Sequence, residues 1–349
     1  MKSYLTSLKI AFTLVGTIIG AGFATGKEIF QFFTQYGAWG TIGVVVSGLL
    51  YMWTSTKIMV ISYHIQARSF NEFNHFLFGK HIGRFLSAIT LCMMIGVTAV
   101  MLSGAGALFK EQLGWSPLIG SFIVIGICFL SLQRGIDGVL IINSLVVPIM
   151  VTIVIIMAFI QFPVLHVSDW FPVQAPSLHS FWLINAIYYV SFNLVTTQAV
   201  LVPLGHDIQD LKAIKRGGVL GGLLFAVCLF AGHLAILSLS DAKLFDIPMV
   251  VLAERIGPLF YGLVFVLIIG EILTTYVGNI YGMTRQMTSF INVPESLLII
   301  SLLVITFLVS LFDYGTLIES LYPFFGQLGL FFTAMVIVRR TPSNIALKR

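Results

Sequence analysis

Long apolar runs separated by short polar connections follow one another along almost the whole chain. Most of these runs are long enough to cross the roughly 30 Å of hydrocarbon in a bilayer, although the fourth is short and the first is interrupted. The pattern predicts an all-α membrane protein with ten transmembrane helices, at Leu5–Phe33, Trp39–Tyr63, Arg84–Phe109, Pro117–Leu132, Gly138–Phe162, Phe181–Leu204, Gly217–Leu239, Pro258–Gly282, Pro294–Phe312 and Thr316–Val338.

The predicted helices divide into two sets of five. Because five is odd, the second set enters the membrane from the opposite side, which predicts an inverted repeat. We expect the first repeat at residues 1–162, an external connector at 163–179, the second repeat at 180–338 and a cytoplasmic tail at 339–349.

The composition leaves no room for a soluble domain, because 58% of the 349 residues are hydrophobic and only 9% are charged. The first apolar run follows Lys2 and Lys9, is far longer than the apolar core of a signal peptide and leads into further spans, so we predict no cleavable signal. Cys92, Cys128 and Cys228 lie in apolar runs without metal-site spacing. We assign no disulfide and no metal to them.

The positions of the basic residues predict the orientation of the chain. With the N-terminus inside, most of the 19 Lys and Arg residues fall at the N-terminus, in alternate loops and in the tail. Cytoplasmic loops accumulate such residues, so we expect a cell-membrane protein with both termini in the cytoplasm. The net charge of +5 then reflects topology and attraction to anionic lipid. It does not indicate nucleic acid binding, because no predicted helix carries a basic stripe with interleaved aromatic residues.

The first predicted helix is interrupted by residues that do not suit a lipid-facing span. It contains four glycines and two charged residues, at Gly16, Gly20, Gly22, Gly26, Lys27 and Glu28. An unwound backbone survives in a membrane only where protein or a water-filled cavity satisfies its polar groups, so this pattern predicts a break at a solute site. The alternative, close helix packing through small residues, does not explain the charges so deep in the span.

The sixth predicted helix is expected to be broken as well, because it is the first helix of the second repeat. Its sequence from Tyr188 to Gln198 has a polar cluster at mid-span, and Pro203 follows. The alternative is an unbroken helix whose Ser, Asn, Thr and Gln side chains bond to neighbouring groups.

The segment Gly20-Ala-Gly22, followed by Phe23-Ala-Thr-Gly-Lys-Glu-Ile, resembles the helix 1 signature of the amino acid–polyamine–organocation superfamily, which has the LeuT-type fold. Within it, the chain most resembles the YkvI-like bacterial membrane proteins, over essentially its whole length. The resemblance implies ten helices in two inverted repeats, with helices 1 and 6 discontinuous. It says little about the solute, because relatives include amino-acid permeases and subunits of spore germinant receptors.

A half-helix that ends at the midplane presents unpaired N–H groups to an anion. We therefore expect the backbone around Gly22 to hold the carboxylate of a zwitterion, and freed carbonyls of helices 1 and 6, with Ser191 and Asn193, to receive its ammonium. Aromatic residues beside the breaks would close over the solute, and Thr98 would belong to the wall. The predicted substrate-binding residues are Gly20, Ala21, Gly22, Phe23, Ala24, Thr25, Thr98, Tyr189, Ser191, Phe192 and Asn193.

The eighth predicted helix places Glu271, Thr274 and Thr275 on one face, and grouped oxygen atoms suit a hard cation. The resemblance to sodium-coupled members implies a Na⁺ site at Thr274 and Thr275, completed by helix 1 carbonyls near Gly16 and Ile19. Glu271 departs from the family pattern, which has a small residue there. It is either a further Na⁺ ligand or a proton carrier, unless it forms a structural pair with Lys27 or His233.

Three charged or titratable residues have simpler explanations. His233 is expected to be a satisfied core histidine rather than a proton relay. Lys27 and Glu28 form a local charge pair in the simpler interpretation of the outer half-helix.

These features favour secondary active transport of a small zwitterion, an amino acid first of all, coupled to Na⁺ or H⁺ and without a cofactor. By the resemblance, a bundle of helices 1, 2, 6 and 7 rocks against helices 3, 4, 8 and 9. The alternative is a germinant-receptor-like sensor that binds an amino acid without transporting it. An enzyme or an ATP-driven pump is disfavoured, because no metalloprotease, serine hydrolase or phosphate-loop motif occurs. A channel would not need two broken helices. The expected partners are the solute and the lipid bilayer, and no obligate protein partner is indicated.

Overall fold

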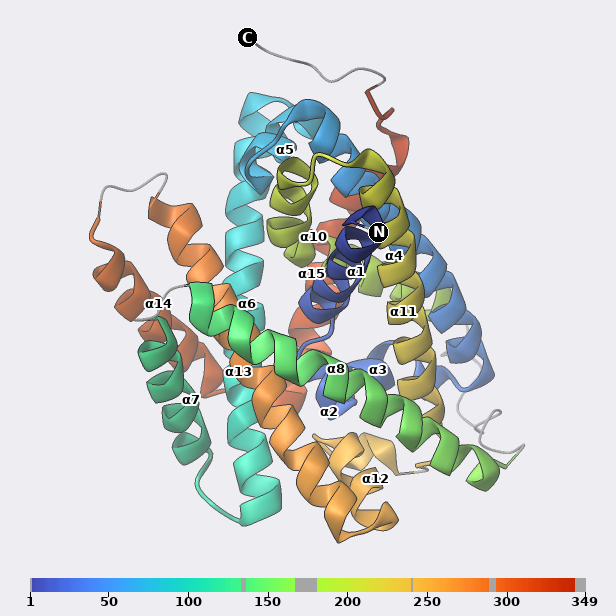
Figure 1. Ribbon diagram of the computed structural model, residues 1–349. Helices are drawn as coiled ribbons and strands as arrows, with labels where there is room; N and C mark the ends of the chain where they lie inside the picture. Colours follow the sequence, from blue (N-terminus) through green and yellow to red (C-terminus); the bar gives the residue numbers. More distant parts are fainter. Residues whose placement is uncertain (1, 133–135, 167–180, 240, 289–292, 343–349) are drawn as a thin grey trace.

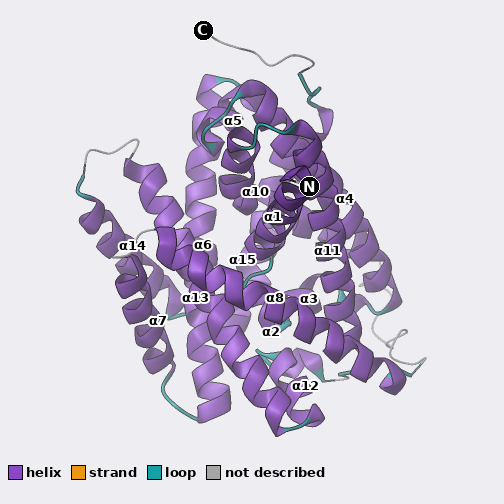
Figure 2. Cartoon of the chain, in the orientation of Figure 1, coloured by secondary structure: helices purple, strands orange, loops and turns teal. Residues whose placement is uncertain are grey.

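The computed structural model describes residues 2–132, 136–166, 181–239, 241–288 and 293–342, and all regular elements in these ranges are helices (Figure 2). The predicted all-α fold class is therefore confirmed for the described chain. Most of the predicted external connector at 163–179 and most of the predicted tail at 339–349 lie outside the described residues.

Seven of the described helices are long and apolar enough to cross a membrane. They are α4 (Ala38–Ile65), α6 (Lys80–Leu113), α8 (Ile136–Gln161), α10 (Trp182–Asp207), α11 (Leu211–Leu237), α13 (Pro258–Thr288) and α15 (Tyr314–Val338). Three apolar helices are shorter, namely α1 (Lys2–Ile18), α7 (Pro117–Leu132) and α14 (Glu295–Ser310). The protein is thus a membrane protein, and the count of ten spans in two repeats stays a prediction.

The helices pack in two groups, which lie side by side in Figure 1. In one group α4 packs against both α10 and α11, and α1 packs on α11. In the other group α6 packs against α7, α13 and α14. The C-terminal helix α15 contacts both α10 and α6, and therefore connects the groups.

The first predicted span is broken, as the sequence predicts. It contains α1, α2 (Ala21–Thr25) and α3 (Lys27–Phe32), and the 3₁₀ turn η1 (Thr34–Tyr36) follows it. Gly20 is extended, with φ −119° and ψ −169°, and Gly26 is left-handed, with φ +82°. A residue with a Cβ rarely adopts the second conformation, so glycine is required at the break between α2 and α3. All five residues of α2 are buried.

The sixth predicted span is not broken, so the prediction of a discontinuous helix there was wrong. It forms the continuous helix α10, which includes Pro203. Three of its polar side chains bond within the helix: the Asn193 amide donates to Tyr189 O at 2.9 Å, and Thr196 and Thr197 donate to carbonyls one turn earlier. Hydroxyl and amide groups that bond to their own helix need no break in it.

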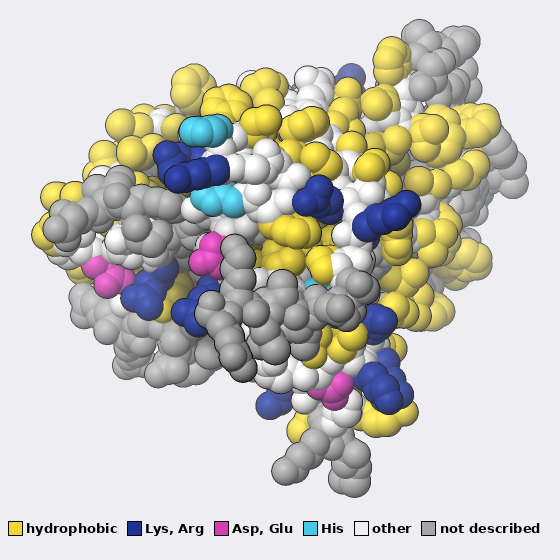
Figure 3. Space-filling view, turned by 90° about the horizontal axis from the view of Figure 1, so that it is seen from above, with side chains coloured by type: hydrophobic (Ala, Val, Ile, Leu, Met, Phe, Trp, Pro, Cys, Tyr) yellow, Lys and Arg dark blue, Asp and Glu magenta, His cyan; other side chains and the backbone are white. Residues whose placement is uncertain are grey.

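Both ends of the described chain lie at one end of the bundle, at the top in Figure 1. There Ser3 donates to Asp210 at the start of α11, and Arg339 after α15 donates to Phe76 O in the short helix α5 (Phe70–Phe78). The view of this end in Figure 3 shows Lys and Arg side chains gathered on it. We call it the basic end.

The opposite end carries the 3₁₀ turns η4 (Ala242–Leu244) and η2 (Phe162–Val164), together with α12 (Pro248–Ile256). Helix α12 packs against α13 and also contacts α2 (Figure 1).

Two glycines of α15 determine how closely α10 approaches it. A Cβ at Gly326 would lie 2.5 Å from Tyr188 Cβ, and a Cβ at Gly329 would lie 2.6 Å from Ser191 O. Larger residues would separate the helices. This close contact places the middle of α10 beside the polar residues of α15.

Candidate functional site

The break between α1 and α2 leaves peptide groups without backbone partners. The backbone ladder reaches Ile19, whose N–H donates to Val15 O at 2.9 Å, and Ala24 N–H then donates to Gly20 O at 2.9 Å. In the described chain, the N–H groups of residues 20–23 donate no backbone hydrogen bond to the preceding turn. Such groups are stable inside a membrane only beside polar protein groups or a ligand.

A buried carboxylate lies over this break. Glu28, in the first turn of α3, is 5% exposed, and a Cβ at Gly22 would collide with its Oε2 atom. The same Cβ would lie 3.3 Å from the Tyr322 hydroxyl of α15. Gly22 therefore makes room for both side chains, and it joins α2, α3 and α15 in one polar contact.

Glu28, Tyr189 and Tyr322 form what we call the central polar cluster. The two hydroxyls and the carboxyl are electrostatic neighbours. Glu28 Oε1, Tyr189 OH and Tyr322 OH are nevertheless buried without a hydrogen bond of good geometry in the described chain. The Tyr189 hydroxyl and the Glu28 carboxyl do interact with each other. Buried polar atoms nearly always have well-aligned partners, so three oxygen atoms without one in the same place indicate a site for a ligand.

Aromatic rings and one hydroxyl pair enclose the cluster. Phe192 lies on the Tyr322 ring, with centroids 4.5 Å apart, and Tyr189 packs edge-on against Phe33 at 4.9 Å. Thr25 Oγ1 donates to Gly22 O at 3.0 Å and lies 2.7 Å from the Tyr314 hydroxyl. This pair ties α2 to the start of α15. Phe23 points elsewhere, toward Phe225 of α11, with centroids 6.4 Å apart.

Lys27 and Glu28 do not form the local charge pair considered from the sequence. The Lys27 ammonium donates to Phe245 O at 3.1 Å and lies 3.7 Å from both Asp246 and Glu319. These contacts join α3 to α15 and to the segment before α12. Lys27 thus points toward the end opposite the basic end, and Glu28 points to the centre.

Asp246 lies among further charges at that end. Burial raises the pKa of the Asp246 carboxyl above its usual value, and the negative charge of Asp313 raises it further. The positive charge of Lys27 lowers it. The backbone N–H of Asp246 also donates to Glu111 at 3.2 Å. In this region the buried Lys27 ammonium lies among several carboxyl groups, including Asp246 and Glu319. We call these residues the outer network.

The predicted ion site is assembled in part. Thr274 Oγ1 donates to Glu271 O at 2.9 Å and lies 3.4 Å from Glu271 Oε2, while Glu271 Oε1 is buried without a partner. Thr275 Oγ1 lies 3.2 Å from where a Cβ at Gly20 would be, so α13 contacts the break directly. Gly16 instead packs against Val147 of α8.

The alternative partners considered for Glu271 are both engaged elsewhere. Lys27 is held at the outer network, and His233 of α11 is hydrogen-bonded through both ring nitrogens, to Thr34 Oγ1 at 3.0 Å and Thr41 Oγ1 at 2.9 Å. His233 is therefore a satisfied core histidine that fastens η1 and α4 to α11. Glu271 pairs with neither residue in the described chain.

The remaining predicted residues differ in their distance from the cluster. Ala21 and Ala24 are buried in α2 between the two breaks. Ser191 Oγ is buried without a described partner where α10 meets Gly329. The Asn193 amide is used within α10, and Thr98 Oγ1 donates to Met94 O of its own helix at 2.6 Å. The structure thus directs neither of the last two polar groups at the break.

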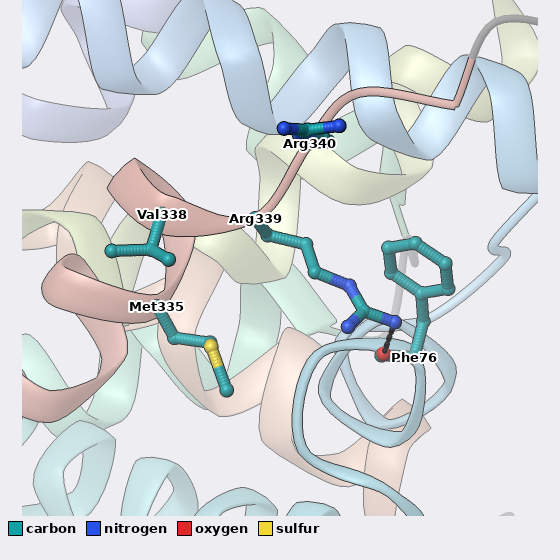
Figure 4. Close-up of a pocket in the computed structure, with 5 residues that line it drawn as sticks. All are labelled: Phe76, Met335, Val338, Arg339 and Arg340. Atoms are coloured by element: carbon teal, nitrogen blue, oxygen red, sulfur yellow. Dashed lines mark hydrogen bonds between the residues drawn. The ribbon is translucent and has the colours of Figure 1, made fainter.

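Two cavities lie away from the central polar cluster. One of about 10 Å³ lies between α6, α10 and α15 and is lined by Thr90, Met93 and Phe332, among others. The other, of about 420 Å³, is an open cleft at the basic end (Figure 4). There Arg339 lies beside the Phe76 ring, with its guanidinium carbon 4.8 Å from the ring centroid. Neither cavity is lined by a residue of the central polar cluster.

Sequence reasoning did not assign Glu28 or Tyr322 to the solute site. A signal existed for Glu28, because an ionisable residue inside a span is functional by default. Tyr322 precedes Pro323 in an apolar helix, which indicated only that α15 faces a polar space. Its position against Gly22 depends on how α15 packs, which no local pattern reveals.

No protein-family model matches the chain. Two proteins of Bacillus subtilis (strain 168) are similar to it over nearly their whole length. The membrane protein YkvI is 38% identical over 343 residues, which cover 97% of each chain. The protein YyaD is 26% identical over 336 residues, which cover 95% of this chain and 96% of YyaD.

Solved structures of transporters have the same fold. MhsT in complex with L-phenylalanine matches 95% of this chain and 87% of its own, with a TM-score of 0.67 and 14% identity. A mutant manganese transporter of Eremococcus coleocola matches 96% of this chain and 78% of its own, with a TM-score of 0.65 and 15% identity. Mhp1, a nucleobase-cation-symport-1 family transporter, matches 90% of this chain and 74% of its own, with a TM-score of 0.53 and 10% identity. The likeness shows the LeuT-type fold, as the first helix predicts.

Proposed function

This chain belongs to the YkvI family of membrane proteins, and from its transporter fold we propose that it is a secondary active transporter rather than an enzyme. The solute in this proposal is a small zwitterion, an amino acid first of all. Its movement is driven by Na⁺ or H⁺ through alternating access.

The observation that carries the proposal is the broken first helix, which faces unpartnered polar atoms at the centre of the bundle. The unpaired N–H groups from Gly20 to Phe23 and the hydroxyls of Tyr189 and Tyr322 offer both donors and acceptors. A zwitterion needs both kinds of group. The site also lies between the two packed groups of helices, so a relative movement of the groups would open it to one side or the other.

The contacts of the outer network are consistent with a site that is closed toward the end opposite the basic end. Lys27 links α3 to Glu319 of α15 and to Asp246 beside α12, so the three elements are held together over the site. Release of these contacts would open the route from that end. In the transport cycle we assign α1–α4, α10 and α11 to the moving bundle and α6, α7, α13 and α14 to the scaffold.

The basic end is cytoplasmic in this proposal, since positively charged residues accumulate on the cytoplasmic side of a cell membrane. The outer network then faces the outside. The proposed ten spans form two inverted repeats of five.

The coupling ion is proposed to bind beside the break, at Thr274, Thr275 and the carbonyls near Gly16 and Ile19. Thr275 contacts Gly20 at the break, so an ion bound at Thr275 would be affected when the two halves of the broken helix move. Glu271, with one unpartnered oxygen, serves either as a Na⁺ ligand or as the carrier of a proton.

Uptake into proteoliposomes tests both the transport and its coupling. Purified protein is given a panel of labelled amino acids under an imposed Na⁺ gradient or an imposed pH gradient, with empty liposomes as background. We expect accumulation under one gradient. Thr275→Ala should reduce Na⁺-driven uptake about tenfold, the effect of roughly 1.4 kcal/mol. Glu271→Gln should abolish H⁺-driven uptake. Thr13→Ala, on an exposed position of α1, is the matched control.

The outcomes separate the candidate functions. Ligand binding without accumulation under either gradient would favour the sensor. If neither binding nor uptake occurred with any amino acid, the amino acid assignment would be lost.

A further inference from the structure

The site lacks the part of the predicted ammonium acceptor that α10 was expected to supply. Two broken helices would have offered free carbonyls, but α10 is continuous and its carbonyls belong to its own hydrogen-bond ladder. The Asn193 amide is also engaged within α10. A strong acceptor does lie at the break, and it is the carboxylate of Glu28.

Glu28 has no positive partner of its own. Its neighbour Lys27 points outward to Asp246 and Glu319, and no described Lys, Arg or His side chain forms an ion pair with Glu28. A carboxylate buried without a counter-ion is costly, because the low dielectric of the interior does not replace water. A cation that enters the site therefore gains more from Glu28 than it would from an exposed carboxylate.

The geometry around Glu28 matches one kind of cation. An ammonium group has three N–H donors. The central polar cluster has three buried oxygen atoms without a well-aligned hydrogen bond in the described chain, namely Glu28 Oε1, Tyr189 OH and Tyr322 OH. The Tyr189 hydroxyl and the Glu28 carboxyl interact with each other. The Phe192 ring, 4.5 Å from the Tyr322 ring, provides an apolar surface for the carbon chain attached to the ammonium.

We propose that Glu28 is the fixed counter-ion of the solute's ammonium group, so that the site selects small amines and does not require a carboxylate on them. This proposal rests on the proposed transport function and names the chemical class of its solute. Tyr189 and Tyr322 accept the remaining N–H groups of the ammonium.

A charge balance follows from the fixed carboxylate. A singly charged amine neutralises Glu28 and leaves the site uncharged. A zwitterion leaves one negative charge in the site, which a single coupling cation then has to neutralise. Amines should therefore bind without Na⁺, while amino acids should bind more tightly when Na⁺ is present.

Matched ligands test this proposal on the full-length protein in nanodiscs. Each set contains an amino acid, its amine and its carboxylic acid: leucine, isoamylamine and isocaproate in one set, and phenylalanine, phenethylamine and hydrocinnamate in the other. Calorimetry without Na⁺ should show that in at least one set the amine binds about 30-fold or more tightly than the acid, the lower end of the effect of a buried charge pair. Acids that bind as tightly as the amines, or amines that do not bind, would overturn the proposal.

Variants locate the effect at Glu28. Glu28→Gln keeps the shape of the side chain and should weaken amine binding about 30-fold, and Tyr322→Phe should weaken it less. Glu72→Gln, at an exposed glutamate of α5, is the control and should leave binding unchanged. If Glu28→Gln does not fold, two measurements still test the proposal. They are the affinities of amines and acids for the wild type, and the amine affinity of Tyr322→Phe. Full amine affinity in a folded Glu28→Gln protein would contradict the proposal.

Failure here differs from failure of the transport function. Amines that bind but are never accumulated would contradict transport alone. Amino acid uptake that Glu28→Gln leaves unchanged would contradict the role of Glu28 and leave the transporter assignment in place.

Discussion

The broken first span and the continuous helix α10 both carry polar sequence at mid-span, yet only the first is interrupted. The first has glycines, which offer no side chain to satisfy a neighbour and which adopt the extended and left-handed conformations seen at Gly20 and Gly26. Helix α10 has Asn and Thr, whose side chains bond back to their own carbonyls. Polarity at mid-span therefore does not predict a break, whereas several glycines together with buried charges do.

The functional consequence is an asymmetric site. One wall presents unpaired backbone and a carboxylate, and the other presents an intact helix that contributes only side chains. The tyrosines of α10 and α15 face Glu28 across this boundary. The solute would thus be held mainly by the first span, and changes there should matter more than changes in α10.

The largest effect is expected at Gly22. Its Cβ in Gly22→Val would collide with Glu28 and press on the Tyr322 hydroxyl, which displaces the central polar cluster. We expect uptake to fall about 100-fold, since a displacement of about 1 Å in a positioned site can cost this much. Gly126→Ala in α7, where nothing lies within 4 Å of the added Cβ, is the control and should transport normally. Normal uptake by Gly22→Val would mean that the cluster is not the site.

A smaller effect is expected at Lys27, which anchors the outer part of the broken span. Lys27→Gln should speed solute dissociation about fivefold, because partly exposed ion pairs contribute roughly 1 kcal/mol. Stopped-flow measurement of ligand release checks this value.

The same anchor should respond to pH. Because burial raises the pKa of Asp246, this carboxyl takes up its proton at a higher pH than an ordinary Asp. Its attraction to Lys27 is present above that raised pKa and is lost as the pH falls through it. Release should therefore become faster on acidification in the wild type, and Asp246→Asn should remove that part of the response. An unchanged pH dependence in Asp246→Asn would place the titrating group elsewhere.

The smallest effect is expected in α10. Within the described chain, the Thr196 hydroxyl donates to two carbonyls of its own helix and to no other group, at 3.1 and 3.2 Å. Thr196→Ala should leave uptake within about twofold and change the unfolding free energy by no more than about 0.5 kcal/mol. Thermal unfolding and uptake measured on the same preparation check both values. A loss of uptake as large as that of Gly22→Val would indicate that α10 breaks during transport. The contrast between the broken first span and the continuous α10 would then hold for one state of the protein only.

Several features of this protein were determined by the sequence alone. The length of the apolar runs predicts a helical membrane protein, and the glycines with Lys27 and Glu28 predict the break in the first span. These are local properties, because a segment's hydrophobicity and the conformations open to glycine do not depend on distant residues.

Only the tertiary structure decided what the polar residues contact. Adjacent residues of a helix project about 100° apart, so Lys27 and Glu28 reach different neighbours: Lys27 meets the acids at the outer end, and Glu28 meets Tyr322 over Gly22. The continuity of α10 was decided in the same way, by which acceptors its polar side chains found. Such contacts join residues that are far apart in the chain, and a local pattern carries no information on which of them meet.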